Sequence, residues 1–245
     1  MAVVLPVVAF PDRGADWLGY LARVTRWTIG ARCTAAEVVA AGRFDAAREA
    51  LTVDEILKGD PGHGPIPLAL PQPAATGSPP HRPRPGDGDR LLMFGTLDGG
   101  PLDVPGAVVP AWATADLDAD IGVARWFAGL PTDPGARAEA LAAVAGDPAE
   151  AGRSSALRAI GDEKLRSASP VVHRAAAETA DPATASYAAV TLWLLDERAA
   201  ATEALAAITD RTGDDEFRAL WGVKPSIGDR VPTVFGPDPD AWSRP

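Results

Sequence analysis

The spacing of the apolar residues changes near Trp112, and this change constrains the fold of the 245-residue chain more than any other feature. Before Trp112 the apolar residues recur mainly at every second position, as they do in half-buried β-strands. After it they recur at every third or fourth position, as they do in amphipathic helices. The sequence therefore predicts an α+β fold in which a β-rich part precedes a helical part.

Several segments of the first part are typical of strands: residues 37–44, 51–57, 66–70 and 90–94, with a weaker candidate at 104–112. Pro65 and Pro67 confine the third strand to an edge of the sheet, because proline has no N–H group to donate to a neighbour. The fourth strand is the most apolar and is expected inside the sheet. From Gly59 to Asp89 the chain has nine prolines and six glycines, which exclude a helix and predict a loop over residues 71–88.

One helix is expected before the strands. Its apolar side chains share one helical face, and they are Trp17, Leu18, Leu21 and Val24. Residues 15–28 are therefore predicted to form an amphipathic helix, which we expect to pack on the sheet.

In the second part, Asp-Pro pairs at Asp133, Asp147 and Asp181 mark expected helix starts. An aspartate accepts hydrogen bonds from the first N–H groups of a helix, and a proline after it has no N–H group to leave unpaired. Gly161 followed by Asp162 predicts the end of one helix and the start of the next. Short helices with narrow apolar faces need one another for stability, so we expect a small antiparallel helical array.

These patterns divide the chain into four parts. They are an N-terminal arm and amphipathic helix (1–32), a β-barrel domain (33–113), a helical domain (114–224) and a proline-rich C-terminal tail (225–245).

Three strand segments follow one another in a characteristic order, at residues 37–43, 51–60 and 88–94. The first is a strand ending in Gly, the second a strand ending in Lys-Gly and the third an apolar strand that begins with Gly. In this order they resemble the five-stranded β-barrel modules of the OB or netrin-like (TIMP-like) type, over residues 33–113. The resemblance implies a small barrel. Netrin-like inhibition depends on an N-terminal cysteine and disulfides, which a chain with Cys33 as its one cysteine cannot form, so that activity is not implied.

The helical part resembles HEAT-like repeats in its paired short helices and Asp-Pro starts. Other helical bundles also fit these features, and they remain an alternative.

Composition excludes several classes of protein. With 23 basic and 33 acidic residues the net charge is −10, which opposes sequence-independent binding to phosphate backbones. The 47% hydrophobic and 23% charged residues are typical of a soluble chain with a core, and no apolar run is long enough to span a membrane. As the sequence stands we expect a cytoplasmic protein; a start further upstream would make it an exported one.

No known catalytic or cofactor motif is present, and the sequence predicts no catalytic residue, metal ligand or cofactor. The three histidines, His63, His81 and His173, lack the spacing of a metal site, and the chain has no phosphate-binding loop, dinucleotide fingerprint or nucleophile elbow. Two of the histidines lie in the proline-rich loop region, where a solvated side chain is expected.

Asp116, Asp118 and Asp120 form the most suggestive cluster, because alternate carboxylates can surround a hard cation. Against this interpretation, Gly122 comes one residue too late for an EF-hand loop, and Phe127 occupies the place of the bidentate glutamate. We favour the alternative that these residues are the charged first turn of a helix over residues 121–130, where the helix dipole stabilises acidic groups.

Two functions remain open. We favour a non-catalytic protein that binds a protein or peptide partner, as an interaction or scaffolding module. The small β-barrel and the helical array both often serve recognition in proteins. The alternative is a hydrolase whose carboxylates meet only in the folded chain. Its candidate residues lie near the barrel loops and are Asp54, Glu55, Asp60 and Asp87.

Overall fold

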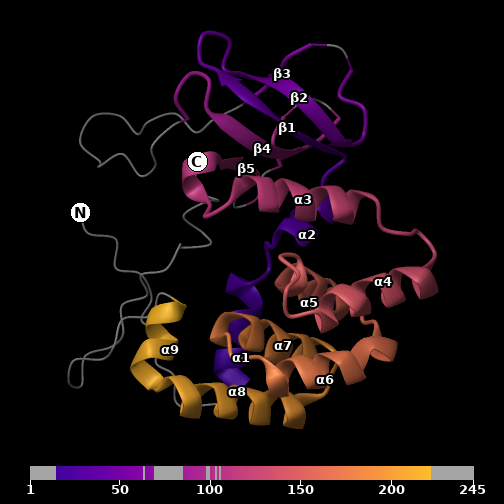
Figure 1. Cartoon of the computed structure of the whole chain (residues 1–245), viewed down its shortest axis with the longest axis vertical. Coiled ribbons are helices and arrows are strands. Elements are labelled where there is room, and N and C mark those ends of the chain that lie inside the picture. The colour runs from indigo at the N-terminus through magenta and orange to yellow at the C-terminus, as the bar shows by residue number, and fades with distance from the viewer. Residues whose placement is uncertain are drawn as a thin grey trace. The chain divides into compact units, whose positions relative to one another are not determined.

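The computed structural model describes residues 15–62, 64–68, 85–97, 100–102, 104 and 106–221. The fold is α+β, which confirms the predicted class (Figure 1). The chain divides into two compact units. Of the described residues, we call those within Ile29–Leu130 the sheet unit, and residues 15–28 together with 131–221 the helical unit. The predicted arm before Ala15, residues 71–84 of the predicted loop and the predicted tail lie outside the described residues.

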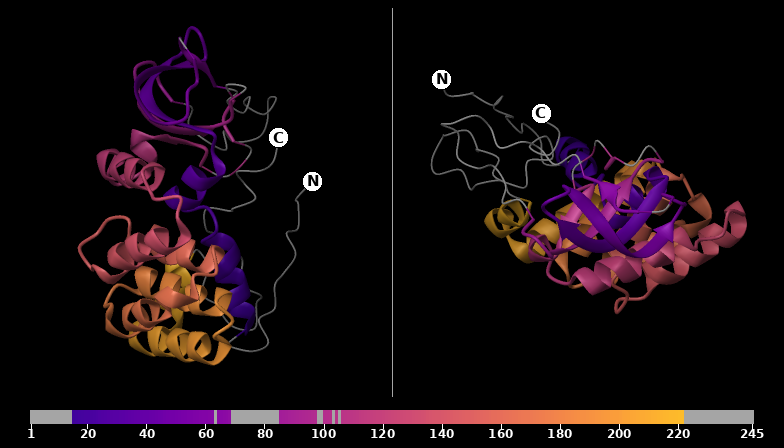
Figure 2. Two further views of the ribbon diagram at one scale, coloured as in Figure 1. Left: turned by 90° about the vertical axis from the view of Figure 1, so that its right-hand side faces the viewer. Right: turned by 90° about the horizontal axis from the view of Figure 1, so that it is seen from above.

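The sheet unit contains a five-stranded antiparallel sheet with the strand order β3-β2-β1-β4-β5. The strands are β1 (Val38–Asp45), β2 (Ala50–Lys58), β3 (Ile66–Pro67), β4 (Arg90–Gly95) and β5 (Val108–Pro110). As predicted, the proline-flanked β3 lies at an edge and the apolar β4 lies inside the sheet. The sheet is curled (Figure 2), with β3 and β5 at its two edges, so the described strands form an open half-barrel.

Both faces are buried from Val38 to Gly42 of β1 and from Leu91 to Gly95 of β4, which explains the apolar sequence of these stretches. One face carries an apolar cluster of Val38, Ala40, Phe44, Leu51, Ile66, Leu68, Leu91 and Met93. The other face carries Val39, Leu92 and Phe94, each fully buried. Helix α3 (Leu117–Ala128) contacts β2 and β4.

A short helix that the sequence patterns did not indicate, α2 (Ile29–Ala35), packs against α3. The two helices approach closely at Gly30, where an added Cβ would lie 2.3 Å from the ring of Phe127. Lys58 at the end of β2 donates hydrogen bonds to the carbonyl oxygens of Cys33 (2.8 Å) and Ala36 (2.5 Å). A cation at the C-terminal end of a helix stabilises its unpaired carbonyl groups, so Lys58 ties α2 to the sheet.

The helical unit is built around α7 (Pro182–Leu194), which contacts four other helices: α1, α5, α6 and α8. Its elements besides α7 are α1 (Ala15–Val24), α4 (Pro134–Gly146), α5 (Arg153–Asp162), the short η2 (Arg166–Ala168), α6 (Ser169–Glu178), α8 (Arg198–Thr212) and α9 (Asp214–Leu220). The buried face of α7 consists largely of alanine, serine and threonine, whose small side chains let neighbouring helices approach closely.

The expectation that the first helix packs on the sheet is wrong. Helix α1 instead contacts α7 and α8 within the helical unit. The ring of Trp17 in α1 lies edge-to-face with Phe217 of α9, with ring centroids 5.4 Å apart. The apolar face of α1 was correctly identified, but the pattern of a single helix does not say which apolar surface it will cover.

Two of the three Asp-Pro pairs start helices as predicted. Asp133 accepts a hydrogen bond from the N–H of Ala136, and Asp181 accepts one from the N–H of Thr184. The prediction for Asp147 is wrong: the chain there forms turns, and α5 begins only at Arg153.

The predicted helix end at Gly161 is correct to within one residue, because α5 ends at Asp162, but the predicted helix start at Asp162 is wrong, since the next element begins at Arg166. The residue with a positive φ after this helix is Lys164 (φ 57°). Gly161 serves packing instead, since an added Cβ would lie 2.9 Å from Leu194 of α7.

The Asp181 cap makes the helical unit sensitive to acid. Burial raises the pKa of Asp181, but hydrogen bonds from the side chain and backbone of Thr184 outweigh it, so the pKa lies below its ordinary value. The stabilisation is therefore complete above the unfolded pKa of about 4 and is lost as pH falls through the lower folded pKa. We expect Asp181→Asn, which keeps a cap oxygen but cannot titrate, to lose less stability than the wild type when urea unfolding is repeated at decreasing pH. Equal losses would contradict this role.

Candidate functional site

The second strand changes register twice against β1, and these shifts form the candidate site. Gly42 lies opposite Val53, but the next residue back, Ala41, lies opposite Glu55. Asp54 is therefore an extra residue, as in a β-bulge, and Glu55 changes to the face of the sheet that carries α3. A regular alternation from Leu51 onward would have placed Val53 and Glu55 on the same face.

Gly42 makes this arrangement possible. A Cβ at this position would lie 2.1 Å from the carbonyl oxygen of Thr52 and 3.0 Å from the Cα of Val53. Both contacts are with backbone atoms, which cannot move away by rotating a side chain. The close approach of β1 and β2 at the register shift thus requires glycine.

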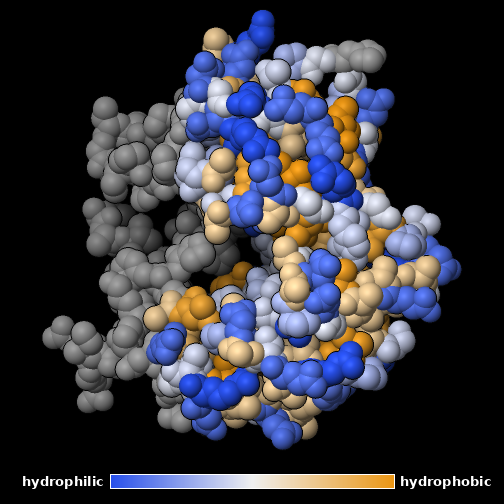
Figure 3. Space-filling view, in the orientation of Figure 1, coloured by the Kyte–Doolittle hydropathy of each residue, from blue (hydrophilic) through white to orange (hydrophobic). Residues whose placement is uncertain are grey.

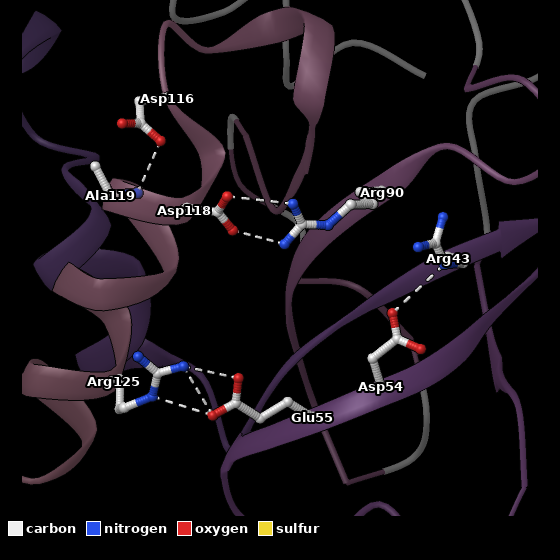
Figure 4. A network of polar contacts seen from close by, with 8 residues as sticks. All are labelled: Arg43, Asp54, Glu55, Arg90, Asp116, Asp118, Ala119 and Arg125. Carbon is white, nitrogen blue, oxygen red and sulfur yellow. Dashed lines mark hydrogen bonds and ion pairs between the residues drawn. The ribbon is translucent and has the colours of Figure 1, made fainter.

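Two ion pairs join α3 to the sheet on this face (Figure 4). Arg125 donates from Nε and Nη2 to the carboxylate of Glu55 in β2, over 2.8–3.0 Å. Arg90 at the start of β4 donates from Nη2 to Asp118 at 2.7 Å. Asp118 and Arg125 are seven residues apart in α3, which places them on one side of the helix two turns apart.

These hydrogen bonds stabilise the charged forms of the side chains. The bonds to Asp118 raise the pKa of Arg90, and the bonds to Glu55 raise the pKa of Arg125. The bonds from Arg90 lower the pKa of Asp118. All four side chains are well exposed to solvent, so the pairs orient α3 more than they stabilise the unit.

A polar hollow of about 220 Å³ lies between the two ion pairs. Its lining includes Ala41 and Gly42 of β1, Ile121 of α3 and the bulge residue Asp54. Arg43 and Arg90 are direct cross-strand neighbours, and such a pair of like charges is unfavourable unless acidic groups offset it. Asp118 does so for Arg90, whereas Asp54 lies 3.8 Å from the Nε of Arg43, beyond hydrogen-bond distance.

A second hollow, of about 530 Å³, lies along the outer edge of β2, and we call it the edge groove. One side is formed by β2 and the other by the chain that returns toward β3. Its lining residues are Thr52, Val53, Asp54, Glu55, Ile56, Pro61, Gly62, Gly64 and Pro65. Ile56 is 46% exposed, which is unusual for a large apolar side chain in a strand. Figure 3 shows apolar surface among hydrophilic residues over the sheet unit.

The four carboxylates of the hydrolase hypothesis divide into two groups. Asp54 and Glu55 line both hollows. Asp60 accepts a hydrogen bond from the backbone N–H of Gly62 at 2.9 Å, as turn residues do, and Asp87 accepts one from the N–H of Ala46 at 3.0 Å, which joins two loops. The hydrolase hypothesis stays a prediction: Asp54 and Glu55, which are neighbours in the chain, share the two hollows, and Asp60 and Asp87 line neither.

The aspartate cluster forms the first turn of α3, as the favoured interpretation predicts, although the helix begins earlier than expected. Asp116 caps the helix by accepting a hydrogen bond from the N–H of Ala119 at 3.0 Å. Asp118 pairs with Arg90, and Asp120 accepts a hydrogen bond from the Thr114 hydroxyl at 2.6 Å.

Of the three histidines, the structure describes His173, and His63 and His81 lie outside the described residues. Its Nε2 lies 2.6 Å from Glu197, which also accepts a hydrogen bond from the hydroxyl of Ser169 at 2.6 Å. The bonds with Ser169 and then His173 lower the pKa of Glu197. Glu197, the residue before α8, thus bonds to two side chains of α6. Because Ser169 and His173 both bond to the Glu197 carboxylate, the cluster does not present a nucleophile bonded to a base.

Cys33 is buried in the sheet unit, where its thiol donates to the carbonyl oxygen of Ala124 at 3.4 Å. In the part of the chain that the structure describes, no three His, Cys, Asp or Glu side chains are grouped so that they could hold a metal ion. Of the described helices, none has the length and apolarity needed to span a membrane.

Sequence reasoning identified the acidic half of the site but missed Arg43, Arg90 and Arg125. Arg125 lies 70 residues after Glu55 in the chain, and Arg90 lies 28 residues before Asp118. The seven-residue spacing of Asp118 and Arg125 was the local signal that could have indicated a charged side of the helix.

No protein-family model, curated protein or solved structure matches the chain, so the likeness to OB, netrin-like and HEAT modules stays a resemblance.

Proposed function

We propose that this protein binds an extended peptide segment, which pairs as an additional strand with the outer edge of β2. The observation that carries the proposal is the mismatch in length between neighbouring strands. β2 has nine residues, and β3 pairs only with the first two, Ala50 and Leu51. Among the described residues, no strand pairs with the outer edge of β2 from Thr52 to Lys58.

The returning chain is poorly suited to cover this edge itself. Pro61 and Pro65 have no N–H groups to offer to β2. Gly62 and Gly64 have positive φ values of 79° and 120°, which are outside the range of a regular strand. A strand edge left open in this way is a template for pairing with another chain, and proteins normally block it with charge, proline or a covering element.

The edge groove suits an extended segment. Main-chain hydrogen bonds to an exposed edge supply affinity in strand addition, and alternate side chains supply specificity. Ile56 offers an apolar contact within the groove. The curled half-barrel, like the OB-type and netrin-like modules that residues 33–113 resemble, would then use its open side for recognition. The HEAT-like resemblance of the helical part is also compatible with a role in binding.

Backbone hydrogen exchange tests the proposal directly. We expect the neutral peptide acetyl-Thr-Val-Thr-Gln-Thr-Val-Thr-amide, at about 1 mM to reach the weak end of peptide affinities, to slow amide exchange between Thr52 and Ile56. The matched control is the same peptide with alternate backbone nitrogens methylated on its pairing edge, which removes the hydrogen-bond donors and leaves the side chains unchanged. The control peptide is expected not to slow exchange.

Two results of this experiment would contradict strand addition. Unchanged exchange at β2 with the neutral peptide would overturn strand addition. Equal slowing by the methylated peptide would also overturn it, because binding would then depend on side chains alone.

A further inference from the structure

We infer that Asp54 makes the edge groove selective for a peptide with an arginine side chain, an inference that rests on the proposed function. The first reason is the charge of the groove. Among the described residues, its charged lining residues are Asp54 and Glu55, and no lysine or arginine lines it. Complementary charge across an interface favours one partner over another more than it raises affinity.

The second reason is that the two carboxylates differ in their partners. Glu55 accepts three hydrogen bonds of 3.0 Å or less from Arg125. Asp54 has looser partners: the Nε of Arg43 lies 3.8 Å away, Arg90 interacts with it electrostatically without a hydrogen bond, and its side chain is 54% exposed. An incoming cation therefore has a strong competitor at Glu55 and a weak one at Asp54.

The third reason is the position of Asp54 in the strand. It is the extra residue at the first register shift, and it lines both the polar hollow and the edge groove. Figure 4 shows its carboxylate directed toward Arg43 of β1, so a guanidinium group in the edge groove would compete with Arg43 for it. A guanidinium group can form two parallel hydrogen bonds with a carboxylate, whereas an ammonium group acts as a point charge, so arginine is preferred over lysine.

The experiment compares peptides that differ only in the central residue of acetyl-Thr-Val-Thr-Xaa-Thr-Val-Thr-amide, with Xaa as Arg, Gln or Glu. We expect the Arg peptide to bind roughly three- to tenfold more tightly than the Gln peptide, and the Glu peptide to bind more weakly than both. The preference should decrease as salt is raised toward 0.5 M, because exposed charges are then screened.

Variants assign the preference to a residue. Asp54→Asn is expected to reduce the Arg-to-Gln ratio of affinities to about one, and Arg43→Gln to increase it by removing the competing cation. Asp87→Asn is the matched control. Asp87 is an acidic residue of the same unit that does not line the groove, and its bond to Ala46 can be kept by asparagine. Here the ratio should stay as in the wild type.

The outcomes separate this inference from the proposed function. If all three peptides slow exchange at β2 and bind equally, strand addition stands and the role of Asp54 is overturned. A preference for arginine that persists in Asp54→Asn overturns that role as well. If no peptide binds, the proposed function fails and takes the inference with it.

Discussion

Replacing Arg158 with alanine is expected to lower the free energy of unfolding of the helical unit by about 3 kcal/mol, because a buried charge network loses its central member. Arg158 in α5 is only 5% exposed. Its Nη1 donates to the carbonyl oxygen of Ala22 at 2.6 Å and to the hydroxyl of Thr25 at 3.0 Å. Its Nε donates to Asp162 at 2.9 Å. The truncation leaves the end of α1 without this partner and Asp162 without its cation.

Urea unfolding followed by far-UV circular dichroism measures this effect. Arg166→Ala is the control, because Arg166 also pairs with an aspartate, Asp196, but its side chain is 70% exposed. We expect the control to change stability by less than about 0.5 kcal/mol, as exposed ion pairs do. An Arg158→Ala protein as stable as the control would show that α1 is held by its apolar face alone.

The second large effect is expected in the sheet unit, where Gly42→Ala should lower stability by about 3 kcal/mol or more. The added methyl group would lie 2.1 Å from the carbonyl oxygen of Thr52, and β1 and β2 must separate to accept it. The same substitution at Gly122 is the control. Gly122 lies inside α3, and a Cβ there meets nothing within 4 Å. It should stabilise the unit by about 0.5–1 kcal/mol, since alanine is the better helix former.

Amide exchange in β1 and β2 reports on this pair of variants strand by strand. We expect faster exchange of the β1 and β2 amides in Gly42→Ala and slower exchange in Gly122→Ala. If Gly42→Ala keeps wild-type exchange, then the two strands can part at this point without loss, and the register shift does not depend on glycine.

The sequence predicts those parts of the fold that depend on local chemistry. Strand β2 was found because its apolar residues alternate, and the edge position of β3 followed from Pro65 and Pro67. The starts of α4 and α7 followed from Asp133 and Asp181, whose side chains satisfy the first N–H groups of each helix.

The parts that were missed depend on contacts between distant residues. Helix α2 has only seven residues, among them a glycine and a threonine with low helix propensity. It depends on packing against α3 and on Lys58, which lies 25 residues after Cys33 in the chain. Asp147 carries the same start signal as Asp133, but α5 begins only after the turns that follow Gly146. An N-cap side chain accepts hydrogen bonds from the first N–H groups of a helix that packing already favours, but the cap alone is not sufficient to form a helix.

The same distinction applies to the candidate site. Asp54 and Glu55 were named from their place near the loops, yet their geometry depends on a register that no local pattern encodes. Alternation assigns Glu55 to the face of Val53, whereas the extra residue assigns it to the face of Ala41 and so to Arg125.

The two register shifts have a consequence for how the length of β2 can vary. The first shift exchanges the faces of Glu55 and Ile56, and the second, between Ile56 and Lys58, restores the original phase. Lys58 therefore lies opposite Val39, on the face it would have occupied in a strand without either shift. Asp54 and Leu57 are the extra residues of the two shifts, so deleting either one would leave Lys58 opposite Val39 and at the end of α2. In relatives of this protein, single-residue deletions in β2 are consequently expected at the positions of Asp54 and Leu57.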